Sequence, residues 1–129
     1  MNGHKEAKAL LASKHWAGAY YLAGYALECG LKACILAYVE RTGIIFEDRK
    51  YAEKCWTHDL EELVSLARLN ESLGLAVAAS PALERNWLIV KDWSELSRYR
   101  RTPHHKAKRL YRAITDKADG MKTWITNHW

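Results

Sequence analysis

The residues with the clearest chemical potential lie in one short basic segment of the chain. From Arg98 to Arg112 the sequence reads RYRRTPHHKAKRLYR, with seven Lys or Arg residues, two adjacent histidines and no acid. Of the 20 Lys and Arg residues in the 129-residue chain, the 13 outside this segment are outnumbered by the 15 Asp and Glu residues. The net charge of +5 therefore belongs to this segment, which indicates an anionic partner.

The side chains of this segment suit a phosphate-bearing ligand. Guanidinium groups bind phosphate oxygens through two parallel hydrogen bonds, and lysines add longer-range attraction. Flat side chains beside them offer surfaces on which unpaired bases stack. The candidate nucleic-acid-binding residues are Tyr99, Arg100, Arg101, Lys106, Lys108 and Arg109.

Two neighbouring histidines add acid–base chemistry to the segment. If the ligand is cleaved, His104 or His105 can take the proton of a ribose 2′-OH or protonate the leaving oxygen near neutral pH. An arginine would stabilise the charge that develops on the phosphate. Neighbouring helical residues project about 100° apart, so the two histidines are a poor chelating pair. We expect no metal and no cofactor, because the sequence also lacks a glycine-rich phosphate loop and a nucleophile elbow.

A helix must present these residues, and the sequence predicts one from about His104 to the C-terminus. Thr102 is expected to cap it and Pro103 to occupy its first position, which leaves free backbone N–H groups that attract anions. Apolar residues recur with helical spacing along this stretch. Its expected buried face comprises Ala107, Leu110, Ile114, Ala118, Met121 and Ile125.

A long apolar stretch from Trp16 to Val39 predicts the central helix, over about residues 17–41. Its length would cross a bilayer, but Glu28 and Lys32 lie at its middle and each is costly there. Small residues recur along one face, which favours close packing inside a helical bundle. Glu28 and Lys32 are four apart and suit a helix ion pair. Whether they form an internal pair or one of them faces the basic cleft stays open.

Three further helices complete the predicted fold. The first covers about residues 4–14, the third begins at Thr57 or His58, and the fourth begins at the Ser80–Pro81 cap signal. Residues 42–56 are expected to form a connecting loop. We therefore predict a single all-α domain over residues 1–129, an antiparallel up-and-down bundle of four main helices plus a short fifth. Three cysteines, an odd count, favour free buried thiols and a cytoplasmic location, and the N-terminal sequence does not resemble a signal peptide.

Four stretches in the same order along the chain carry a family resemblance. They are AYYLAGYALECGLKA, HDLEELV, NWLIVKDWSELSRYR and the terminal WITNHW. Together they resemble a prokaryotic branch of the HEPN domain family, over nearly the whole chain. The resemblance implies a helical bundle that forms homodimers and binds RNA or nucleotides. Many members are metal-independent endoribonucleases, some pair with minimal nucleotidyltransferases in toxin–antitoxin systems, and others have no known catalysis.

The resemblance also implies a candidate catalytic pair. Nuclease members carry an arginine and a histidine separated by four to six residues at the dimer cleft. Arg98 meets this spacing with His104 and with His105, and Arg100 meets it with His105. An Asn, Asp or His often follows the arginine in the family, where this chain has Tyr99 after Arg98 and Arg101 after Arg100. By this likeness the candidate catalytic residues are Arg98, His104 and His105.

Two functions stay open on the sequence alone. The first is an RNA- or nucleotide-binding homodimer, either an endoribonuclease of a toxin–antitoxin pair or a binding protein without catalysis. The alternative is a non-catalytic helical protein-interaction module, in which the basic segment is a solvated loop and helix start.

Overall fold

The computed structural model describes residues 3–129, apart from the side chain of Arg98, and within that range the chain forms helices and no strand. The all-α class is therefore confirmed. The elements are α1 Gly3–Ala12, α2 Trp16–Thr42, α3 Ile44–Glu47, α4 Arg49–Lys54, α5 Leu60–Leu66, α6 Asn70–Ala79, α7 Pro81–Lys91, the 3-10 helix η1 Glu95–Tyr99, α8 His104–Thr115 and α9 Met121–Thr126.

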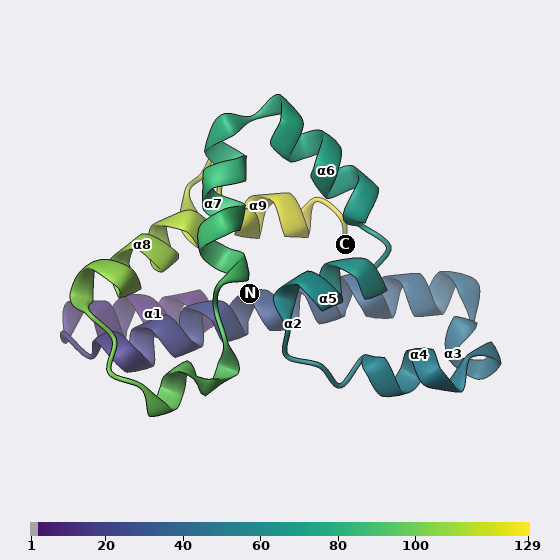
Figure 1. The fold of residues 1–129 in the computed structure, drawn as a ribbon, viewed down its shortest axis with the longest axis horizontal. Coiled ribbons are helices and arrows are strands. Elements are labelled where there is room, and N and C mark those ends of the chain that lie inside the picture. Colours follow the sequence, from purple (N-terminus) through teal and green to yellow (C-terminus); the bar gives the residue numbers. More distant parts are fainter. Residues whose placement is uncertain (1–2) are drawn as a thin grey trace.

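The long helix α2 is the spine of the molecule. Figure 1 shows α1 lying along its first half and α5 against its second half, and α8, α9 and η1 also contact it. The predicted stripe of small residues is buried at Ala19, Ala23, Ala26 and Gly30. Its last two members, Ala33 and Ala37, are half-buried. The helix ends at Gly43, whose left-handed φ of 67° directs its N–H to the carbonyl of Val39.

The apolar character of α2 has an explanation inside the fold. By length and composition the helix could cross a membrane, but half of its most apolar window is buried against other helices. A core helix and a membrane span both meet those two criteria. The expectation that this chain involves no membrane therefore stays a prediction.

The start of α7 confirms its local sequence signal, whereas α5 begins at Leu60, after the predicted Thr57 or His58. The Ser80 hydroxyl accepts a hydrogen bond from the Leu83 N–H at 3.1 Å, and Pro81 follows as the first residue of α7. Asp59 caps α5 by accepting from the N–H groups of Glu61 and Glu62. The apolar residues that recur with helical spacing in these two helices are buried: Leu60, Leu63, Val64 and Ala67 in and just after α5, and Leu83, Trp87 and Val90 in α7.

The structure has helices that the sequence did not predict. The expected connecting loop contains α3 and α4, and α6 follows α5 as a separate helix. Only Leu73 of α6 is buried, while Leu75 is exposed, so its apolar residues do not line one buried face. Helical periodicity therefore gave no signal there.

The predicted final helix is wrong in one respect, because it is two helices. Asp116 accepts the N–H groups of Ala118 and Asp119, which ends α8 in a turn of the kind that aspartate favours. Ala118, expected in the core, is exposed. Gly120 closes the turn, and a Cβ at that position would overlap the backbone oxygens of Asp116 and Ile114.

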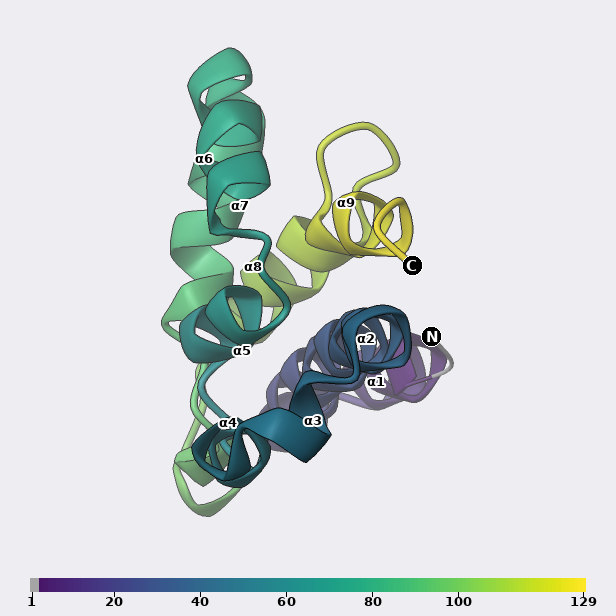
Figure 2. The ribbon, with the colours of Figure 1, turned by 90° about the vertical axis from the view of Figure 1, so that its right-hand side faces the viewer.

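The helices do not all align with the spine. In Figure 2 the hairpin of α6 and α7 stands as a column beside α1 and α2, and α9 lies beyond the end of α8. Helix α8 carries the second half of the basic segment and contacts both α2 and α7. This junction positions the candidate site.

Candidate functional site

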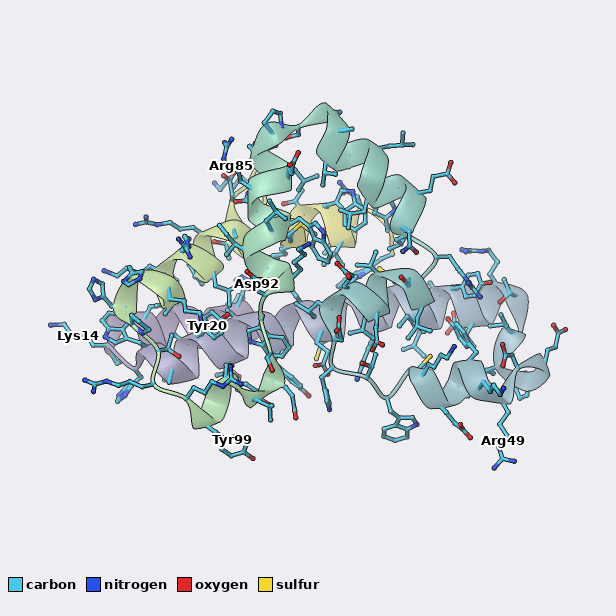
Figure 3. All side chains as sticks on the ribbon, in the orientation of Figure 1. Lys14, Tyr20, Arg49, Arg85, Asp92 and Tyr99 are labelled. Atoms are coloured by element: carbon cyan, nitrogen blue, oxygen red, sulfur yellow. The ribbon has the colours of Figure 1, made fainter. Side chains whose placement is uncertain are left out.

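The basic segment begins in η1 and continues through an extended stretch into α8. Arg98 lies within η1, and its side chain is outside the described part of the structure. Tyr99 is 72% exposed and points away from the body of the molecule (Figure 3). Arg100 and Arg101 are exposed on the extended stretch that follows.

The start of α8 differs from the predicted cap. Pro103 is the N-cap residue, with extended backbone, and His104 is the first helical residue. Thr102 is buried and makes no capping hydrogen bond, so its predicted role is wrong. The first turn of α8 holds no acidic side chain. Its positive end therefore faces the two histidines without an internal counter-charge.

The adjacent histidines form a small aromatic cluster with the start of α2. The ring centroids of His104 and His105 are 5.8 Å apart and nearly perpendicular. The His104 ring also lies 5.8 Å from the Trp16 ring. Both histidines are exposed, so their ring nitrogens are accessible for proton transfer.

A cavity of about 550 Å³ opens where α2, α7 and α8 meet. Its volume falls in the range typical of small-ligand sites. Two of its residues, Lys106 and Arg109, lie one turn apart on α8 and so share a face of that helix. The lining residues are Tyr20, Leu88, Ile89, Asp92, Lys106 and Arg109.

Charged groups from three elements act on Tyr20 at this cavity. Burial raises the pKa of the Tyr20 hydroxyl, the Asp92 carboxylate raises it further, and the cations of Arg109 and Arg100 oppose both. The Lys106 ammonium lies 5.1 Å from the centre of the Tyr20 ring. Figure 3 shows Tyr20 and Asp92 beside each other at this junction. The cavity lining thus combines two cations, one carboxylate and one phenol, and Arg100 adds positive charge from outside the lining.

Lys108 contacts a different part of the surface. Its ammonium lies 5.5 Å from the Trp16 ring centre, on the side of α8 that also carries His104. Residues two apart on a helix project in nearly opposite directions, which separates Lys108 from Lys106. The predicted basic patch therefore divides into a cavity side and a Trp16 side.

Glu28 and Lys32 lie away from the cavity and belong to a second cluster. Glu28 is 2% exposed, and its carboxylate accepts from the Lys32 ammonium at 3.1 Å. His58 Nδ1 lies 3.0 Å from both oxygens of the same carboxylate. His58 Nε2 lies 3.7 Å from a Glu95 oxygen on η1. The predicted internal pair is present, and it is part of a larger network.

Sequence reasoning missed several residues of both clusters. His58 was expected to help start the third helix, but Asp59 alone caps α5 and His58 binds Glu28. Tyr20 and Asp92 were not expected at the basic site. No short-range pattern identifies them, because their partners lie far away in the sequence.

The cysteines and possible metal ligands are the remaining reactive groups. Cys34 is buried, Cys55 is half-buried and Cys29 is exposed on α2, so the prediction of three core thiols is wrong for Cys29. Within residues 3–129, no three His, Cys, Asp or Glu side chains converge as a metal site.

In comparisons with protein-family models, curated proteins and solved structures, the chain matches none of them. Its function is therefore inferred from the residues and geometry above.

Proposed function

We propose that this chain binds RNA or a nucleotide at the junction of α2, α7 and α8. The observation that carries the proposal is the cavity of about 550 Å³ into which Lys106 and Arg109 both reach from one face of α8. Arg100 adds positive charge at Tyr20 from the extended stretch after η1. A phosphate would occupy the cationic side of the cavity.

The other lining residues of the cavity suit the ribose and base of a nucleotide. Asp92 can accept hydrogen bonds from ribose hydroxyls or from base amino groups. Leu88 and Ile89 supply apolar surface, and Tyr20 supplies an aromatic edge. A carboxylate beside two cations favours a ligand that carries both a phosphate and hydrogen-bond donors, which describes a nucleotide better than an inorganic anion.

Catalysis is the finer part of the proposal. His104 and His105 are exposed on the first turn of α8, just before the cavity cations Lys106 and Arg109. The HEPN resemblance, with Arg98 as partner, leads us to propose metal-independent endoribonuclease activity. It also leads us to propose a cytoplasmic homodimer with the antiparallel bundle of that family, in a toxin–antitoxin pair with a minimal nucleotidyltransferase.

Binding can be tested with a labelled single-stranded RNA oligonucleotide at low salt. Replacing Lys106 and Arg109 together with Ala should lower RNA affinity about tenfold or more, because both cations reach one cavity. The slope of log affinity against log salt should flatten by about 0.7 for each phosphate that the variant no longer neutralises. Fluorescence anisotropy at several salt concentrations measures both quantities.

The matched control removes the same two charges at a distant place. Arg49 and Lys50 are exposed on α4, and Figure 3 shows Arg49 at the opposite end of the molecule from Tyr20. Their double Ala variant should change affinity by about twofold or less. Equal losses in both double variants would indicate non-specific attraction to the net charge and would refute the cavity as the binding site.

A second candidate function is a non-catalytic protein-interaction module. Phe46 on α3 and Trp56 after α4 are 91% and 82% exposed, and exposed aromatic residues are typical of protein interfaces. Wild-type protein without affinity for RNA or nucleotides at low salt would favour this candidate.

A further inference from the structure

The network around Glu28 joins three parts of the chain through one histidine. His58 stands between Glu28 of α2 and Glu95 of η1, with its two ring nitrogens facing one carboxylate each. The Nδ1 contact is 3.0 Å and the Nε2 contact is 3.7 Å. Glu28 is buried, whereas the His58 side chain is about half exposed. Solvent protons therefore reach the ring.

The protonation state of His58 decides how many of these contacts are favourable. A neutral imidazole carries one N–H, so with Nδ1 donating to Glu28 its Nε2 lone pair faces the Glu95 carboxylate. An imidazolium donates from both nitrogens and attracts both carboxylates. The observed arrangement is the one that an imidazolium satisfies.

The other contacts that attach η1 and the residues before it to α2 include close packing and two unpaired buried polar atoms, so an added ion pair can change the stability of this attachment. Trp93, just before η1, packs on Gly24 of α2 so closely that a Cβ at Gly24 would overlap its indole ring. Among the described residues, Trp93 Nε1 and Ser97 Oγ are buried polar atoms without a hydrogen-bond partner. Such atoms destabilise the interface that buries them. The His58–Glu95 contact adds attraction to this interface.

The position of η1 in turn decides where Arg100 lies. Arg100 is the C-cap residue of η1, and its charge acts on Tyr20 in the cavity. An η1 that detaches from α2 would move this cation away from the cavity.

We propose that His58 is a positioning residue for the candidate binding site, and that its imidazolium holds η1 on α2 by bridging Glu28 and Glu95. The inference rests on the proposed function only for its effect on ligand binding. The bridge needs a donor on each ring nitrogen, and only the imidazolium has both.

Other charged and titratable groups lie near the bridge. Lys32 on α2 pairs with Glu28 and competes with His58 for the same carboxylate. Asp59, next to His58, is engaged in the α5 cap, and Glu61 of α5 pairs with Lys91 of α7 at 3.9 Å. Cys55, beside Lys32, has its thiol pKa raised by burial. Among these charged groups, Glu95 is the one that connects η1 to His58.

Hydrogen–deuterium exchange of the amides of residues 95–101 tests the bridge without any ligand. Exchange should be compared at about pH 5.5 and about pH 8, on either side of the ordinary histidine range, after correction for intrinsic rates. In the wild type, protection should be about two- to fivefold greater at the lower pH, the range for a partly exposed ion pair. His58→Gln keeps a hydrogen-bond donor but never ionises, and it should abolish this difference.

Glu95→Gln is the milder second variant, because it leaves the buried Glu28 pair intact. It should abolish the pH difference as His58→Gln does. His15→Gln and Glu40→Gln, at exposed positions of the same residue types, should retain it. No pH difference in the wild type, or an unchanged difference in both His58→Gln and Glu95→Gln, would overturn the proposal.

RNA binding at the same two pH values tests the effect on the site. Because the basic segment contains histidines of its own, the measured quantity is the difference between wild type and Glu95→Gln. The wild type should gain about two- to fivefold more affinity at low pH than the variant. Equal gains would refute the positioning role. Wild-type protein that binds no RNA would instead refute the proposed function, and the exchange result would still decide whether the bridge exists.

Discussion

At the scale of single residues, neighbouring side chains of the same type do different things. Lys106 lines the cavity beside Tyr20, whereas Lys108 covers Trp16 on the other side of α8. His104 contacts Trp16 through its ring, while His105 contacts only His104 among the ring pairs within residues 3–129. His104 is the first residue of α8 and has a ring contact with α2, and we expect it to be the acid–base residue.

His104→Ala should therefore abolish RNA cleavage while leaving RNA affinity within about twofold of wild type. Removal of a general acid or base lowers the rate by about 10² to 10⁴. Cleavage is measured with EDTA present, and the expected product carries a 2′,3′-cyclic phosphate. Arg98→Ala should impair both cleavage and binding.

Cleavage that persists in the double variant lacking His104 and His105 would reject this catalytic assignment. Wild-type protein that binds RNA without cutting it, with or without EDTA, would support a binding protein without catalysis.

At the scale of elements, the attachment of η1 to α2 depends on a glycine. Gly24 is buried in α2 directly under the Trp93 indole. Alanine has the higher helix propensity, by about 1 kcal/mol in a helix interior. The indole is 3% exposed and its ring atoms Cε2, Nε1 and Cδ2 would overlap an added Cβ, so overpacking of about 1 to 3 kcal/mol should outweigh that gain.

We predict that Gly24→Ala lowers the free energy of unfolding by up to about 2 kcal/mol, measured by urea denaturation. Gly74→Ala is the matched control, because Gly74 is exposed on α6 and a Cβ there meets nothing within 4 Å. That variant should raise stability by about 0.5 to 1 kcal/mol. A stabilising Gly24→Ala would show that Trp93 is free to move and that η1 is loosely attached.

At the scale of the whole molecule, exposed apolar residues support the homodimer that we propose. Tyr25, Cys29 and Leu36 are exposed on α2 and recur at steps of four and seven residues, which places them on one side of the helix. Lys32 lies on the same side between Cys29 and Leu36, so these apolar residues are separate rather than a continuous stripe. Exposed apolar residues gathered on one side of a helix occur at protein interfaces. This side is separate from the stripe of small residues that the fold buries.

Sedimentation at tens of micromolar should therefore give the mass of a dimer. Leu36→Asp should shift the protein towards the monomer by placing a charge in the interface. Leu75→Asp is the control, because Leu75 on α6 is similarly exposed, 68% against 61% for Leu36. A monomeric wild type would contradict the dimer and weaken any mechanism that needs two subunits around one RNA strand.

The sequence by itself determined those features that depend on neighbours along the chain. Helical periodicity identified the buried residues of α5 and α7, and cap chemistry located the start of α7 at Ser80. The start of α5 was predicted at Thr57 or His58, whereas Asp59 caps it. The apolar run of α2 and the charge of the basic segment could also be identified from the sequence. These signals are local, because helical hydrogen bonds and caps join residues at most a few positions apart.

Only the tertiary structure decided which side chains meet. Glu28 and His58 are 30 residues apart, and the cavity joins Tyr20, Asp92 and Lys106 from three parts of the chain. The split between Lys106 and Lys108, and the exposure of Ala118, likewise depend on how α8 is rotated and where it ends. Side chains on packed helices meet according to the rotation and crossing of those helices, and that geometry follows from the packing of the whole core rather than from any short segment.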